Sequence, residues 1–169
     1  MSTLLDFYRG EGMDCEGRTF ESYIASTDAR LEASHNLIQW LFPLNTESNY
    51  NPDAPLLTDN DIKIWQVDPV LQENLRRAYH RWLEFTGMQE MDDGFIDLIV
   101  PKRFYAVFGS PNHNWLRITR VLLSLRTLGL RVECDRYWNT LTKIHAEGLV
   151  SENSFGYWRD ASQGIDRKS

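Results

Sequence analysis

The stretch LEASHNLIQWLFPL, residues Leu31 to Leu44, decides the fold expected for this chain. Its apolar side chains recur at the spacing of a helix, and they widen toward its end until little of the last turn is polar. Pro43 cannot continue a helix and pushes Phe42 away from helical geometry, so the helix is expected to end near Leu41. Because such a helix needs cover on most sides, the sequence predicts a bundle packed around it.

Length and composition are typical of one globular domain. The chain has 169 residues, of which 42% are hydrophobic and 25% are charged, which is enough for one sizeable core. The net charge of −6 argues against a surface that binds nucleic acid or anionic membrane on all sides. No apolar run reaches the ~20 residues of a membrane helix, and no apolar leader begins the chain. We therefore expect a cytoplasmic protein with no membrane span, in which Cys15 and Cys134 are reduced thiols.

Start and stop signals outline the helices. Thr58 and Asp61 resemble a capping arrangement, and Asp68 with Pro69 marks a helix that Gly87 ends. The remaining expected helices cover 18–33, the central stretch to 41, 114–128, a segment from Glu133 or Asp135 to Gly148, and a segment after Ser151.

Other segments lack a sustained helical period. Residues 1–17 are expected to form an arm or loop, and residues 44–57 form a long ordered loop. Residues 96–100 favour an extended segment, but one such run without a partner makes no sheet. The sequence thus predicts an N-terminal arm (1–17), a helical domain (18–163) and a frayed tail (164–169). Its fold class is all-α, one irregular bundle of about six or seven helices.

Histidines are the first place to look for catalysis. His35 lies on the apolar stripe of the central helix, where a buried, hydrogen-bonded structural histidine is the favoured interpretation. His80 and Glu84 are one helical turn apart and could bind one metal ion, although an exposed pair explains them more simply. The sequence has no nucleophile elbow and no nucleotide-binding glycine motif. An enzyme is therefore the less favoured class and no cofactor is expected, but a small metal-dependent or hydrolytic enzyme built on His35 or His80 stays open.

Two binding surfaces are suggested by an uneven charge distribution. Residues 44–99 carry eleven acids and four bases, whereas residues 100–136 carry two acids and seven bases. Arg117 and Arg120, with Arg103 and Arg126, could form a basic face that binds an anion or nucleic acid. A solvated helix face paired with the acidic segment is the simpler alternative.

The opposite hypothesis is an aromatic groove near the acids of residues 44–99. Carboxylates would hold a free amine and aromatic rings would hold an aromatic side chain, so a short peptide would fit. The rings of this groove would come from Trp40, Tyr50, Trp65 and Trp82.

Several separated motifs, spread over nearly the whole chain, carry a resemblance to a known family. They are FYRG at 7–10, the central stretch at 31–44, LT followed by acids at 57–61, LRRAYHRWLEFTG at 75–87, HNWLRITRVLLSLRTLGL at 113–130 and SFGYW at 154–158. By these motifs the chain resembles the N-terminal region of the opioid growth factor receptor family.

The resemblance implies a recognition domain without enzymatic activity. Vertebrate members of the family are named for binding an opioid pentapeptide, methionine enkephalin, and are described as membrane-associated and nuclear. A peptide or protein is therefore the expected partner, and nucleic acid is the less favoured one. The residues expected to contact a ligand are His35, Trp40, Tyr50, Trp65, Trp82, Arg117 and Arg120.

Overall fold

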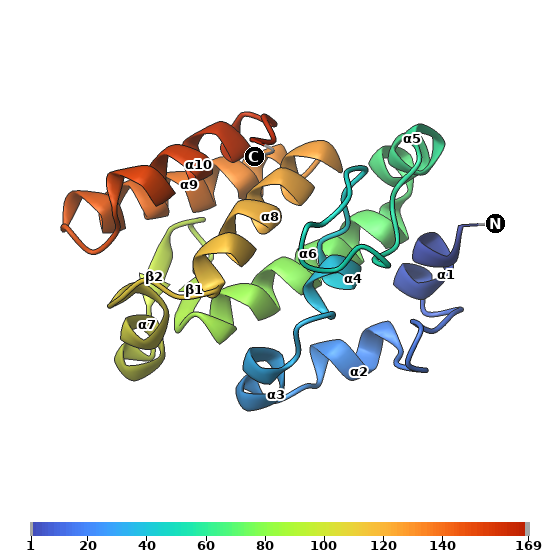
Figure 1. Cartoon of the computed structure of the whole chain (residues 1–169), viewed down its shortest axis with the longest axis horizontal. Coiled ribbons are helices and arrows are strands. Elements are labelled where there is room, and N and C mark those ends of the chain that lie inside the picture. Colours follow the sequence, from blue (N-terminus) through green and yellow to red (C-terminus); the bar gives the residue numbers. More distant parts are fainter. Residues whose placement is uncertain (1, 168–169) are drawn as a thin grey trace. The chain divides into compact units, whose positions relative to one another are not determined.

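Helices dominate the computed structural model, which describes residues 2–167 (Figure 1). The first helices are α1 (Thr3–Arg9), α2 (Phe20–Ile24), α3 (Asp28–Ala33), α4 (Ile38–Leu41), α5 (Asp59–Val67) and α6 (Pro69–Phe85). They are followed by β1 (Met88–Glu90), β2 (Ile96–Leu98), α7 (Pro101–Phe108), α8 (Asn114–Thr127), α9 (Arg131–Ala146) and α10 (Glu152–Ser162). This confirms the all-α class, with ten helices among residues 2–167 in place of the six or seven expected.

The chain forms two compact units, residues 1–79 and 80–169. Several of the expected helix starts and stops hold in both. In the first, Thr58 and Asp61 form a full capping box at the start of α5, with bonds of 3.1 and 2.9 Å. In the second, the Ser151 hydroxyl accepts a bond from the Ser154 N–H at the start of α10. Gly87 adopts φ +79° just after α6, as its role of helix stop requires.

The segment expected to be an arm contains helix α1. Leu4, Leu5, Phe7 and Tyr8 are all buried, and Gly10 ends the helix in the left-handed conformation at φ +81°. Seven residues are too few for a periodic pattern to show in the sequence, which is why this helix was missed.

The expected continuous helix from residue 31 to 41 is wrong. α3 ends at Ala33, Ser34 adopts an extended conformation, and only four residues, Ile38–Leu41, return to a helix. The end before Pro43 is as expected. The preceding helix is also split, because Thr27 caps a new start by accepting a bond from the Arg30 N–H.

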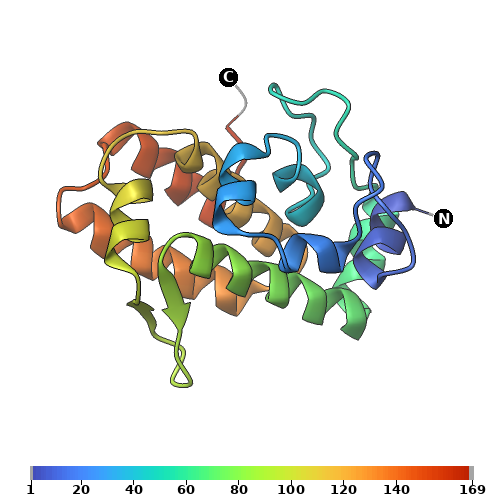
Figure 2. The ribbon, with the colours of Figure 1, turned by 90° about the horizontal axis from the view of Figure 1, so that it is seen from below.

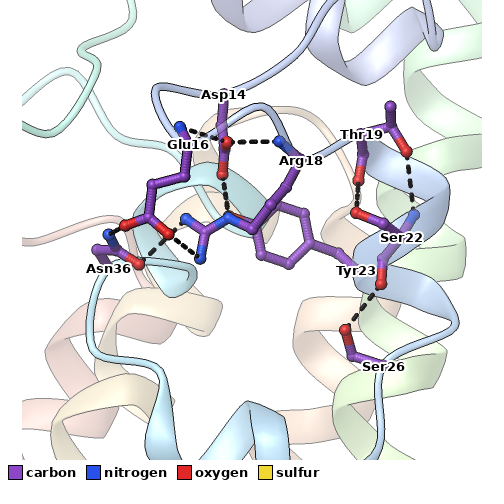
Figure 3. A network of polar contacts seen from close by, with 8 residues as sticks. All are labelled: Asp14, Glu16, Arg18, Thr19, Ser22, Tyr23, Ser26 and Asn36. Atoms are coloured by element: carbon purple, nitrogen blue, oxygen red, sulfur yellow. Dashed lines mark hydrogen bonds and ion pairs between the residues drawn. The ribbon is translucent and has the colours of Figure 1, made fainter.

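Asp14 lies at the centre of a polar network in the first unit (Figure 3). Its Oδ1 accepts hydrogen bonds from the backbone N–H groups of Glu16 and Arg18, each at 2.9 Å. Its Oδ2 accepts from Arg18 Nε at 2.6 Å and from the Tyr23 hydroxyl at 2.5 Å. Asn36 completes the network by accepting from Arg18 Nη2 at 3.1 Å and donating to Glu16. These bonds hold the chain between α3 and α4 against the loop after α1, and they explain the break in the central helix.

The network fixes the protonation of its two buried acids. Burial alone would raise the pKa of Asp14, but the hydrogen bonds from Tyr23 and Arg18 outweigh it, so that this pKa lies below its usual value. Burial, followed by the bond to Asp14, raises the pKa of Tyr23 far above its usual value. A carboxylate and a neutral phenol are therefore the stable pair.

An aromatic cluster forms the core of the first unit. The ring of Phe7 lies 5.1 Å from Trp40 and 6.1 Å from Phe20, both in edge-to-face geometry. Tyr8 packs 4.5 Å from Trp65 and donates its hydroxyl to the backbone oxygen of Leu41. Helix α1 thus contributes the centre of this core.

The second unit is built on three helices that pack against one another, α8, α9 and α10 (Figure 1). Tryptophans of α8 and α10 donate to buried backbone oxygens. Trp158 Nε1 donates to Trp115 O at 3.0 Å, and Trp115 Nε1 donates to Val107 O at 2.8 Å. These bonds connect α10 with α8 and α8 with α7 through satisfied polar groups.

Candidate interaction surface

Three of the four aromatic residues expected to line a groove lie in the cores. Trp40 and Trp65 are buried in the cluster around Phe7 and Tyr8. Trp82 is buried in the second unit, where its Nε1 donates to the Tyr137 hydroxyl at 2.9 Å. As they stand, these rings offer no open surface to a ligand.

Tyr50 differs from these tryptophans. Its side chain lies in the loop between α4 and α5 and is 79% exposed, so it is open to contact from solvent. Among the expected aromatic residues it is therefore the accessible one.

The expected position of His35 inside the core is wrong. The residue is exposed, because it falls in the break between α3 and α4 rather than on a helical stripe. His80 is exposed on α6 as well. Among residues 2–167, no group of three or more His, Cys, Asp and Glu side chains is placed to hold a metal ion.

The arginines do not form the exposed basic face that the sequence suggested. Arg117 is only 7% exposed, and its Nη1 donates to Asn114 Oδ1 at 3.4 Å. Burial lowers the pKa of Arg120 to about 10, although the charge of Asp166 opposes this shift. Arg126 is paired with Asp135 at 3.3 Å. The face of α8 that carries Arg117 is turned into the unit, because packing and not the local pattern decides which face is covered.

A β-hairpin in the second unit was not expected. β1 and β2 pair antiparallel, and Figure 2 shows the hairpin at the lower edge of the view, with its turn projecting from the second unit. The Gly94 N–H donates to Met91 O at 2.8 Å, and Gly94 adopts φ +84°. A three-residue loop that ends in a left-handed glycine is a common hairpin connection.

Large apolar side chains lie exposed on and beside this hairpin. Phe95 is 63% exposed and Ile99 is 50% exposed, although both belong to a unit whose core is otherwise well filled. Several exposed large apolar side chains within one short segment are typical of an interaction site. We call this group the hairpin surface; its members are Met91, Phe95, Leu98, Ile99 and Val100.

The hairpin surface carries unpaired negative charge. Residues 88–99 contain four acids and no lysine or arginine. Glu90 is paired with Arg136 at 2.7 Å. Asp92, Asp93 and Asp97 are exposed, and in the part of the chain that the structure describes none of the three has an ion pair.

Among the described residues, the backbone groups on the outer edge of β2 are unpaired, and α9 is the helix that packs against this strand. The bond from the Ile99 N–H to Gly87 O, 2.8 Å long, fixes which pairs of the ladder exchange hydrogen bonds. Bonded and non-bonded pairs alternate in an antiparallel ladder, so Ile96 and Leu98 direct their N–H and C=O groups away from β1. Within residues 2–167, nothing bonds to these four backbone groups.

Side chains of α9 hold the hairpin in place. Arg136 pairs with Glu90, and its guanidinium lies where a side chain on Gly94 would be, 2.7 Å from the position of a Cβ. The Lys143 ammonium lies 5.6 Å from the centre of the Phe95 ring. An isolated two-stranded hairpin is marginal in water, so these contacts explain how a short one persists.

The sequence did contain a signal for this hairpin. Asp92, Asp93 and Gly94 separate MQEM from FIDL, and a three-residue loop with glycine last between two such runs is a recognised hairpin pattern. The run at 96–100 was therefore correctly seen as extended, and its partner strand was overlooked.

Known proteins are similar to this chain over the region that carries these sequence motifs. The sequence model of a family described as the opioid growth factor receptor (OGFr) conserved region matches residues 4–161. The chain belongs to the opioid growth factor receptor family. No solved structure matches the chain.

Relatives within the family are similar over part of their length. The opioid growth factor receptor of Homo sapiens is 40% identical over 103 residues, which are 59% of this chain and 15% of the relative. The receptor of Rattus norvegicus is 40% identical over 126 residues, 73% of this chain and 21% of the relative. The opioid growth factor receptor-like protein 1 of Rattus norvegicus is 39% identical over 128 residues, which are 74% of this chain and 26% of the relative. The chain thus aligns with about a quarter or less of these relatives.

Each helix among residues 2–167 is too short or too polar to cross a membrane.

Proposed function

We propose that this domain is a non-enzymatic recognition module of the opioid growth factor receptor family, and that it binds a peptide or protein partner through the hairpin surface. One observation carries the proposal: large apolar side chains, Phe95 and Ile99 among them, are held exposed beside a strand edge whose backbone groups are unpaired in the described chain. Burying such side chains contributes about 25 cal/mol per Å² of apolar area removed from water. A partner that covers them gains free energy that the folded chain alone does not obtain.

A peptide library displayed on phage and selected against the whole chain tests this proposal. Selected peptides should bind the wild-type chain and lose most of their binding to the double variant Phe95→Ser, Leu98→Ser. The control is Val67→Ser, which changes an even more exposed apolar side chain in the first unit. The proposal fails if no peptide is enriched, or if the double variant binds the enriched peptides as the wild type does.

The narrower proposal is an opioid peptide as ligand, supported by the names of the relatives. The unpaired acids Asp92, Asp93 and Asp97 could hold a free amine, and the apolar side chains could hold an aromatic ring. Titration calorimetry with methionine enkephalin should show a heat of binding that Phe95→Ser abolishes. Tyr50→Ser is the parallel variant for the exposed aromatic side chain expected from the sequence. No heat at millimolar peptide ends this reading for the chain.

We also propose a cytoplasmic, reducing compartment. Cys15 is exposed and unpaired, and Cys134 is buried, where burial raises its pKa to about 12. Alkylation in intact cells followed by fractionation should find Cys15 reduced in the cytoplasmic fraction. Recovery with oxidised Cys15 in a secretory compartment would contradict the proposal.

A further inference from the structure

We propose that the partner adds a third strand to the sheet at the outer edge of β2, and that it is an extended peptide segment which alternates basic and apolar residues. This inference rests on the proposed function, since it names the chemistry of the partner for the same surface. The added strand would form hydrogen bonds with the backbone groups of Ile96 and Leu98.

Backbone geometry supports strand addition. The N–H and C=O groups of Ile96 and Leu98 point away from β1 and have no bond within residues 2–167. An extended peptide beside such an edge gains main-chain hydrogen bonds, each contributing about 1 kcal/mol net. A helix laid on the same side chains would leave these groups unpaired.

β2 is the favoured edge of the two-stranded sheet. Met88 of β1 is buried, whereas Leu98 at the end of β2 is 42% exposed. The exposed apolar residues Ile99 and Val100 continue directly from β2. A strand on this side can therefore form backbone bonds and cover apolar side chains together.

Charge decides between a foreign peptide and a second copy of this chain. Residues 88–99 carry four acids and no base, and Asp92, Asp93 and Asp97 lack ion pairs in the described part of the chain. Two hairpins of this kind placed edge to edge would bring these acids together, and like charges directly opposite each other in a sheet are destabilising. Nearby cations are already engaged, Arg136 with Glu90 and Lys143 with the Phe95 ring. Lysines or arginines from the partner would complement these three carboxylates, which have no ion pair among residues 2–167.

A defined probe tests the proposal on the whole chain. The acetylated and amidated heptapeptide Lys-Val-Lys-Ile-Lys-Val-Lys, labelled with a fluorophore, is titrated with protein and followed by fluorescence anisotropy. A second peptide carries glutamate in place of each lysine, and a third is N-methylated at its internal residues. The third peptide keeps the side chains and loses the donors. The basic peptide should bind at least roughly tenfold more tightly than either of the others.

Substitutions in the chain separate the edge from the charge. Leu98→Pro removes an outward N–H while the bonded ladder positions are kept, because proline is accepted where the N–H of an edge strand faces solvent. This substitution should lower the affinity for the basic peptide by roughly tenfold. Asp97→Lys should weaken it at low salt and have less effect at high salt. Asp53→Lys, the same change on an exposed loop of the first unit, is the charge-matched control and should leave binding unchanged.

The outcomes distinguish this inference from the proposed function. Peptides from the library that need Phe95 and Leu98, but are acidic or bind equally well when N-methylated, overturn the strand-addition inference and keep the recognition function. A library that yields no peptide dependent on those side chains overturns both. Dimerisation of the wild type in sedimentation, lost in Leu98→Pro, would assign the edge to a second copy and overturn the inference.

Discussion

Residues 14–36 of the first unit and residues 88–100 of the second use acids and aromatic side chains in opposite ways. In the first segment, Asp14 accepts bonds from three residues and Tyr23 is buried beside it. In the second segment, Asp92 and Phe95 are exposed, and Asp92 has no ion pair among the described residues. Residue type alone therefore does not separate structure from function. What separates a structural group from a functional one is the number of partners that the fold supplies to it.

Two phenylalanines give the largest expected contrast. Phe7→Ala removes a fully buried ring from the aromatic cluster and should lower the free energy of unfolding by about 3–5 kcal/mol. Phe95→Ala removes an exposed ring whose lysine contact is weak and should cost less than about 1 kcal/mol. Urea unfolding followed by circular dichroism measures both. Equal losses would mean that the hairpin surface is part of the core.

Two aspartates give the next contrast. Asp14→Ala leaves Arg18 and Tyr23 without their buried acceptor and should cost about 3 kcal/mol. Asp92→Ala should change the free energy of unfolding by no more than about 0.5 kcal/mol. The same urea titrations compare them, and a costly Asp92→Ala would show that this acid has a structural partner.

The smallest effect is the acid dependence of the Asp14 network. Its pKa lies below the usual 3.8, so the folded state favours the carboxylate and gains stability that is fully present above that value. This stability is lost as the pH falls through the lowered pKa. The difference in unfolding free energy between the wild type and Asp14→Asn should be constant from about pH 7 to about pH 5 and should shrink below about pH 4. A difference that stays constant to about pH 2 would contradict the lowered pKa.

Local signals were the part of the fold that could be predicted from the sequence. Three helix starts could be predicted because a cap needs only neighbours in sequence. They are marked by Thr58 with Asp61, by Asp68 with Pro69, and by Ser151. The break at Ser34 could not be foreseen in the same way, since Asn36 is held by Glu16 and Arg18 from an earlier loop. Long-range bonds of this kind override helical spacing.

The candidate site was harder to predict than the fold. Aromatic residues were expected to face a ligand, yet Trp40 and Trp65 fill a core, because a large ring gains most where it is fully buried. Arg117 was expected on a solvated face and is covered by packing. The hairpin depends on pairing between two three-residue strands, and only the loop that ends in Gly94 signalled it.

The contacts of Arg136 with the hairpin have a consequence for the entropy of association. Ordering one backbone residue costs about 1–2 kcal/mol of conformational free energy, and a loop that folds on binding meets that cost at the moment of contact. Here Glu90 and the turn at Gly94 already contact Arg136 of α9, so the hairpin is ordered before any partner arrives. The free-energy cost of ordering then falls on the partner alone. Arg136→Ala would loosen the hairpin turn, so that part of this cost would fall on this chain at binding.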